Sequence, residues 1–180
     1  MHAFVTRLRS RLLPLGIILL AVALDILTKQ LVVAYLKPIG TYPIIRDVFH
    51  LTYATNTGAA WSIFSAPDQR WIFMTISTVA ILGMLVYLTM ADIPSRLMQL
   101  GIGALIGGGI GNMIDRVSLG YVVDFLDARI INFPIFNVAD CFITIGAGCL
   151  FVGLLLQWRR EDMAARAAKE READGNHQDQ

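Results

Sequence analysis

Two aspartates in the second half of the chain, Asp124 and Asp140, could act together as an acid and a base. Two carboxyl groups close together in a partly dry site share one proton, because both cannot ionise easily. The ionised member can take a proton from water while the protonated member donates one to a carbonyl oxygen, as in aspartic proteases. A catalytic pair is therefore one hypothesis for these residues.

Asp140 can also be explained by local structure alone. Pro134 disfavours helix at the residue before it, and Asn137 is a natural N-cap residue, so Asp140 would occupy the third position of a helix. A carboxylate is favoured there by the helix dipole. The spacing leaves both readings open, a capping acid and a catalytic acid.

Two further groups of polar residues flank apolar runs. Asp25 and Lys29 have the i, i+4 spacing of a helical ion pair, and we interpret them as structural. Asn112 and Arg116 share the same spacing, and Asp115 between them can pair locally or with another loop. A fixed cation and an amide at a membrane surface suit a polar substrate, although a salt bridge anchoring the helix end is the alternative.

Other hydrolytic sites fit the sequence less well. There is no His-Glu-x-x-His motif, and the histidines at positions 2, 50 and 177 are scattered, so we expect no metal and no cofactor. No Gly-x-Ser-x-Gly motif occurs. A serine-lysine mechanism needs a lysine beside its serine, but Lys29 already has Asp25 at i, i+4 spacing. Cys141 and Cys149 are eight positions apart in an apolar run, and we expect both to be structural.

The composition indicates that these residues are carried by membrane helices. Of the 180 residues, 56% are hydrophobic and 16% are charged, which is too apolar for an ordinary soluble domain. The net charge of +1 gives no support for a nucleic-acid partner. Four apolar stretches have about the length of a membrane span, so we predict an all-α membrane protein with spans over residues 12–36, 71–90, 97–113 and 139–158.

The distribution of basic residues predicts that both termini are cytoplasmic. That orientation places nine Lys and Arg residues inside and five outside. Residues 37–70 and 114–138 then face outward. Residues 42–64 combine β-branched and aromatic residues with turn formers, which predicts a small extracytoplasmic β-containing segment. Residues 1–160 form one predicted domain, and residues 161–180 a cytoplasmic polar tail.

A transporter or proton channel is the main competing class, because ionisable residues within spans also mark ion paths. Such a path should place carboxylates throughout the depth of the membrane. Here four acids are expected at one edge, and only Asp25 is expected to lie deeper. A non-catalytic scaffold is a third possibility. It would be built on the glycines at positions 101, 103, 107, 108, 109 and 111, which allow close helix packing.

Five ordered blocks of this chain resemble the lipoprotein signal peptidases, also called type II signal peptidases. They are Asp-Ile-Leu-Thr-Lys at 25–29, Asn-Thr-Gly-Ala-Ala-Trp at 56–61, Gly-Asn-Met-Ile-Asp-Arg at 111–116, Val-Asp-Phe at 123–125 and Phe-Pro-Ile-Phe-Asn-Val-Ala-Asp at 133–140. The resemblance covers residues 12–158. Trp61 stands where many members carry phenylalanine.

The resemblance implies an inner-membrane protease that cuts diacylglyceryl-modified prolipoproteins just before the lipidated cysteine. It places Asp124 and Asp140 on the two catalytic aspartates at the outer, periplasmic face. It further implies that a set of polar residues binds substrate or supports the site: Asn56, Gly58, Asn112, Arg116 and Asn137. We expect membrane lipids as partners and a monomeric enzyme.

Overall fold

The computed structural model describes residues 2–58, 70–91, 93 and 95–178. Four helices carry most of the chain: α1 (His2–Leu31), α2 (Arg70–Met90), α3 (Arg96–Ser118) and α4 (Val138–Gln178). A π-helical turn, Val32–Leu36, continues α1. The predicted stretch 12–36 is covered by α1 and this turn, and each of the other three lies within one helix, because a backbone without water must satisfy its hydrogen bonds internally.

Three of these helices are long and apolar enough to cross a membrane, among the residues described. The candidate spans are Arg11–Leu36, Arg96–Ser118 and Val138–Lys169. The remaining predicted span, residues 71–90, lies in α2. The apolar part of α2, Met74–Met90, is shorter than the three candidate spans. The structure therefore confirms a mostly helical fold, with three candidate spans among the described residues, and does not confirm the predicted count of four.

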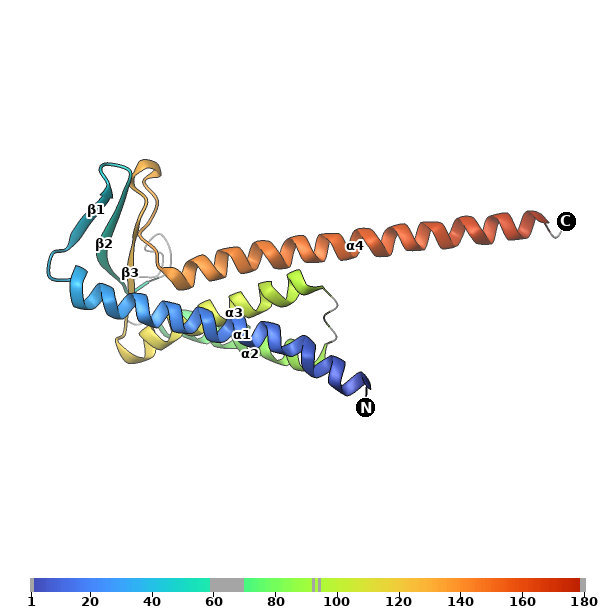
Figure 1. The fold of residues 1–180 in the computed structure, drawn as a ribbon, viewed down its shortest axis with the longest axis horizontal. Helices are drawn as coiled ribbons and strands as arrows, with labels where there is room; N and C mark the ends of the chain where they lie inside the picture. The colour runs from blue at the N-terminus through green and yellow to red at the C-terminus, as the bar shows by residue number, and fades with distance from the viewer. Residues whose placement is uncertain (1, 59–69, 92, 94, 179–180) are drawn as a thin grey trace.

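Helix α4 is longer than a membrane span requires. It continues without a break from Val138 to Gln178, past residue 158, where the last predicted span ends. Figure 1 shows its second half projecting past the other helices, with both chain ends on the side away from the sheet. Charged and alanine-rich residues favour helix there even without packing partners.

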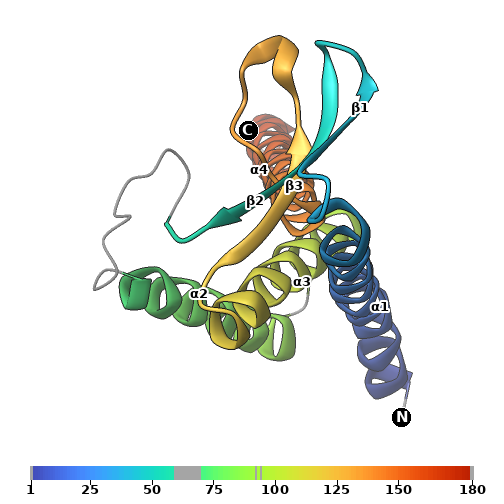
Figure 2. The same cartoon turned by 90° about the vertical axis from the view of Figure 1, so that its left-hand side faces the viewer.

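A three-stranded antiparallel sheet lies across one end of the helices (Figure 2). Its strands are β1 (Thr41–Ile45), β2 (Phe49–Asn56) and β3 (Val122–Asp127), in the order β1-β2-β3. The first two strands confirm the predicted β-containing segment. Its last residues, 59–64, which include Trp61, lie outside the described part of the chain. Strand β3 was expected only as a loop, because its partner is distant in sequence.

The glycine-rich face of α3 packs against two helices. Cβ atoms added at Gly103 and Gly107 would lie 2.8 Å from Pro14 O and 2.7 Å from Ala21 Cβ, both on α1. A Cβ at Gly108 would lie 2.5 Å from Ala139 O on α4. The predicted close packing is confirmed, and it brings α1, α3 and α4 together beside the sheet.

Replacing Gly108 by alanine should destabilise the bundle. The new methyl group would meet backbone atoms of α4, which cannot rotate away, and such overpacking costs about 1–3 kcal/mol, more than the gain in helix propensity. Thermal unfolding of the purified protein in detergent measures the effect. Gly148→Ala is the matched control, because a Cβ at Gly148 meets nothing within 4 Å. Equal unfolding temperatures for the two variants would contradict this account.

Candidate active site

Strand β3 carries Asp124 at the point where the sheet meets the helices. In the register of the sheet, Asp124 lies opposite Ala54 of β2. Its carboxylate accepts hydrogen bonds from Asn56 Nδ2 at 3.1 Å and from Asn137 Nδ2 at 2.7 Å. With only 3% of its surface exposed, Asp124 is a buried acid whose two oxygens are each held by an amide.

Asp140 lies in the first turn of α4. Its backbone N–H donates to Asn137 Oδ1 at 3.0 Å, and its carboxylate accepts from the Asn137 backbone N–H at 3.1 Å. These reciprocal bonds form a capping box, so the prediction of Asn137 as the N-cap residue is confirmed. Phe136 is fixed in turn by backbone bonds to Leu126 of β3. The start of α4 is thus attached to the strand that carries Asp124.

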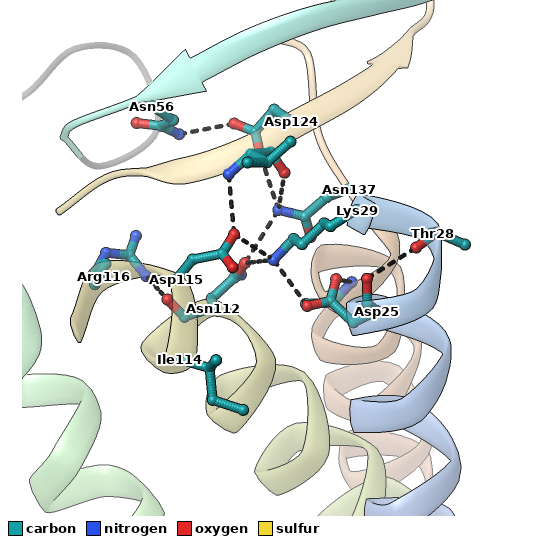
Figure 3. Close-up of polar contacts among 12 residues, drawn as sticks. Asp25, Thr28, Lys29, Asn56, Asn112, Ile114, Asp115, Arg116, Asp124 and Asn137 are labelled. Carbon is teal, nitrogen blue, oxygen red and sulfur yellow. Dashed lines mark hydrogen bonds and ion pairs between the residues drawn. The ribbon is translucent and has the colours of Figure 1, made fainter. Parts of the chain in front are cut away.

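Two buried asparagines connect the two aspartates. Asn137 Nδ2 donates to Asp124 and also to Asn112 Oδ1, at 3.0 Å. Asn112 Nδ2 donates to the second acid, Asp140, at 2.8 Å. Both carboxylates therefore belong to one hydrogen-bond network, and the structure brings together two residues that come from different elements. Figure 3 shows Asn137 between Asn112 and Asp124.

A buried ion cluster adjoins this network. Lys29 Nζ lies 2.7 Å from Asp25 Oδ2, which confirms the predicted i, i+4 pair. The same ammonium group lies 3.0 Å from Asp115 Oδ2 and donates to Asn112 Oδ1 at 3.2 Å (Figure 3). Asp115 thus pairs with α1, a contact between residues far apart in sequence that spacing alone did not predict.

Asp25 is bound to the start of α4. Its Oδ1 accepts from the backbone N–H of Ala139, at 3.0 Å, in the first turn of that helix. Asp25 therefore contacts the turn that carries Asp140. An unpaired carboxylate in the apolar interior would be costly, whereas this position supplies a cation and a backbone donor. The acids consequently gather at one end of the helices and do not form a path along them.

A cavity of about 940 Å³ opens beside the two aspartates. Asp124 and Asp140 both line it, together with the predicted site residues Asn56, Gly58 and Arg116. The remaining wall is mostly apolar and includes Phe133, Pro134, Ile135, Phe136, Ile143 and Ile145. The cavity thus combines a polar end containing two acids with an apolar wall. That combination suits an amphipathic ligand.

Sequence reasoning missed part of this wall. Cys141, expected to be merely structural, lines the cavity next to Asp140. Ile143 and Thr144 also line it, and they follow Asp140 by three and four positions, which is the spacing of neighbours on one helical face. That spacing is the signal that could have identified them.

The supporting residues lie at different distances from the cavity. Asn112 and Asn137 are 6% and 0% exposed and hold the acids from within the protein. Arg116 Nη1 donates to the Asn112 backbone carbonyl at 3.3 Å, so the predicted shared face is confirmed. Asn56 Oδ1 accepts from the Gly58 backbone N–H at 3.1 Å, which fixes the amide that donates to Asp124.

The electrostatic surroundings favour the protonated form of Asp124. Burial raises the pKa of Asp124 to about 6, and the negative charge of Asp140 acts in the same direction. Hydrogen bonds from Asn56 and Asn137 and the charge of Lys29 oppose this rise only in part. The carboxyl group of Asp140 accepts hydrogen bonds from Asn112 Nδ2 and from the Asn137 backbone N–H. An acid able to keep its proton thus lies in one network with a carboxylate, which is a starting state for acid-base chemistry.

Comparison with known proteins decides the family. Residues 17–156 match the family described as signal peptidase (SPase) II. The chain is 42% identical to a lipoprotein signal peptidase of Brevibacillus brevis over 139 residues, which are 77% of this chain and 92% of the relative. It is 46% identical to a lipoprotein signal peptidase of Trichormus variabilis, over 76% of this chain and 85% of the relative. The chain belongs to the signal peptidase II family.

Two solved structures share the fold of this signal peptidase II family member. A bacterial membrane enzyme determined by the in meso method is 34% identical, with a TM-score of 0.70 over 79% of this chain and 87% of that one. A second structure of the same description gives a TM-score of 0.69. The resemblance identified from five sequence blocks is therefore confirmed, and the family makes this chain a protease with apolar membrane helices.

Proposed function

We propose that this chain is an aspartic endopeptidase that removes the signal peptide from diacylglyceryl-modified prolipoproteins, cutting just before the lipidated cysteine. The observation that carries the proposal is the joint exposure of Asp124 and Asp140 to one cavity, with both acids held in one amide network. The printed names of the relatives, lipoprotein signal peptidases, supply the substrate class.

The two acids would divide the chemistry between them. Asp140 takes a proton from a water molecule, which then attacks the scissile carbonyl carbon. Asp124, whose pKa is raised to about 6 by burial and by the charge of Asp140, gives its proton to the carbonyl oxygen. The resulting tetrahedral intermediate collapses as the proton held by Asp140 passes to the leaving amine and one hydroxyl of the intermediate returns its proton to Asp124, which restores both acids. Asn137 and Asn112 keep the carboxylates in place during both transfers.

The cavity wall suggests how the substrate lies. Asn56 and Arg116 offer an amide and a cation at the polar end, where they can bind the peptide backbone around the scissile bond. The apolar residues of segment 133–136 and of α4 can contact the apolar signal helix or the acyl chains of the substrate. Gly58 supports this arrangement by holding the Asn56 amide.

We further propose a four-span protein in the bacterial inner membrane, with α2 as the fourth span and residues 161–180 as a cytoplasmic tail. Arginines and lysines concentrate near both chain ends, which favours a cytoplasmic location for each. The sheet and both aspartates then face the periplasm. A monomer surrounded by membrane lipids suffices, because both aspartates and the network that holds them come from one chain.

The decisive experiment is cleavage of a lipidated prolipoprotein by the purified protein in detergent. Mass spectrometry of the product should show a new N-terminal cysteine that carries the diacylglyceryl group. The same precursor without its lipid is the matched control and should be cut at least about tenfold more slowly, because the apolar contacts of the acyl chains are lost. Equal cleavage of both precursors would contradict the substrate assignment, and activity that vanished with a metal chelator would contradict the aspartic mechanism.

The pH dependence of this reaction should respond to Asn56. Asp124 is protonated below its pKa of about 6, so kcat/KM should fall as the pH rises through that value. Asn56 donates to the charged carboxylate and so lowers the pKa. In Asn56→Ala the pKa rises further, and the alkaline limb of the profile should move up by about 0.5–1 pH unit.

Thr52→Ala is the matched control for this pH measurement. Thr52 lies on the same strand, but its hydroxyl donates to Asp127 rather than to Asp124. We expect its alkaline limb to coincide with that of the wild type. A limb in Asn56→Ala that stayed in place, or moved to lower pH, would show that Asp124 does not hold the proton.

A further inference from the structure

We propose that the ion triad of Asp25, Lys29 and Asp115 positions the catalytic pair by binding the backbone next to each catalytic aspartate. This inference rests on the proposed function of Asp124 and Asp140. It assigns to the triad a role in the reaction beyond that of a structural ion pair.

The first contact fixes the backbone before Asp140. Asp25 Oδ1 accepts from the Ala139 backbone N–H at 3.0 Å, and Ala139 immediately precedes Asp140. Asp25 and Ala139 are both 0% exposed. Gly111 makes room for this carboxylate, since a Cβ there would lie 2.6 Å from Asp25 Oδ2. A residue of α1 thereby sets the position of the first turn of α4.

The second contact is equivalent and fixes the backbone before Asp124. Asp115 Oδ2 accepts from the Val123 backbone N–H at 3.0 Å, and Val123 immediately precedes Asp124. Asp115 and Val123 are buried. Each triad carboxylate therefore binds the amide of the residue just before one member of the catalytic pair.

Lys29 connects these two contacts. Its ammonium group lies 2.7 Å from Asp25 and 3.0 Å from Asp115, so it holds together two buried carboxylates that would otherwise repel each other. Its third contact, at 3.2 Å, is to Asn112 Oδ1, and Asn112 donates to Asp140. The ammonium group thus makes two ion pairs and one hydrogen bond within this cluster. The relative position of the two catalytic acids thus depends on one buried cation.

The triad is better suited to positioning the catalytic aspartates than to stabilising the fold. A buried ion pair contributes little net stability, because the cost of removing its charges from water offsets their attraction. Such a cluster does fix the directions of its hydrogen bonds. Catalytic groups that must share a proton and a water molecule tolerate only small displacements, so a misplaced backbone next to either acid lowers turnover.

The triad also acts on the charge state of Asp124. The charged groups that act on Asp124 are Lys29 from α1, Arg116 from α3 and Asp140 from α4, and Asp115 of α3 is paired with Lys29. The positive charge of Lys29 lowers the pKa of Asp124. Lys29→Arg keeps this charge in place, whereas the loss of Lys29 and the loss of the two triad carboxylates act on this pKa in opposite directions.

The test uses a variant in which the triad is neutral but keeps its shape, Asp25→Asn/Lys29→Met/Asp115→Asn, in the full-length protein. The asparagine oxygens can still accept from Ala139 and Val123, and no unpaired charge stays buried. We expect this variant to insert and fold. Turnover of a lipidated prolipoprotein should fall about 10- to 100-fold in kcat, with KM within about threefold of the wild type.

Lys29→Arg provides a second, independent measurement. It keeps the positive charge but changes the reach and direction of the donors, so kcat should fall while the alkaline limb stays in place. If the neutral variant fails to fold, Lys29→Arg decides alone. Wild-type kcat in a folded Lys29→Arg, or in a folded neutral variant, would overturn the positioning role.

Two controls distinguish a failure of the positioning role from a failure of the proposed catalytic function. Asp127→Asn/Arg129→Gln neutralises another ion pair at the far end of β3, and it should leave kcat and the pH profile unchanged. Asp124→Asn tests the catalytic pair itself. If Asp124→Asn keeps turnover, the proposed function fails. If it is inactive while the neutral triad variant works normally, only the positioning role fails.

Discussion

Asp124→Asn and Asp140→Asn should each remove turnover of a lipidated prolipoprotein while leaving membrane insertion and folding intact. Asparagine keeps the shape of aspartate and one acceptor oxygen, so the bonds from Asn137 and Asn112 can largely persist. It cannot give or take the proton. We expect kcat to fall by about 10²–10⁴-fold in each variant, the range that general acid-base catalysis contributes. Turnover by purified protein in detergent measures this directly.

The two substitutions should not be additive. Because the acids share one proton and act on one water molecule, the double variant should lose little more activity than either single variant. Asp127→Asn is the matched control, since Asp127 is buried on the same strand but bonds to Thr52 and Arg129, away from the cavity. It should retain turnover within about threefold. Normal turnover by both single variants would exclude Asp124 and Asp140 as the catalytic pair.

Asn137→Ser should lower turnover by about 100-fold, although serine is a good N-cap residue. The asparagine side chain performs two tasks in the structure. Its oxygen accepts from the Asp140 backbone N–H, and its amide nitrogen donates to Asp124 and Asn112. Serine can replace the oxygen but cannot reach both acceptors. Asp124 would lose its shortest hydrogen bond and its connection to the second acid.

Asn137→Ala is the companion variant that separates capping from catalysis. Alanine removes both tasks, so it should cost about 1 kcal/mol more folding free energy than serine, the usual value of an N-cap, at a similar loss of turnover. Thermal unfolding and turnover, measured on the same samples, distinguish the two effects. If Asn137→Ser matched the wild type in turnover while Asn137→Ala did not, the asparagine would be only a helix cap.

Local patterns in the sequence predicted much of what positions the site. The i, i+4 spacing of Asp25 and Lys29 predicted their ion pair, because helical periodicity alone brings them together. The order of Pro134, Asn137 and Asp140 predicted the start of α4 and its cap, which depend only on neighbouring residues. The long apolar runs predicted the helices for the same reason. The family blocks added the identity of the two acids.

The tertiary structure decided which of these local pieces meet. Strand β3 exists because residues of β2 pair with it, and Asp124 reaches the site only through that pairing. Asp25 bonds to Ala139, 114 positions away, so this contact could not be read from its own helix. Spacing along the chain fixes contacts within about one helical turn. Contacts between distant segments depend on how α1, α3, α4 and the sheet pack, and they turn two separate acids into one site.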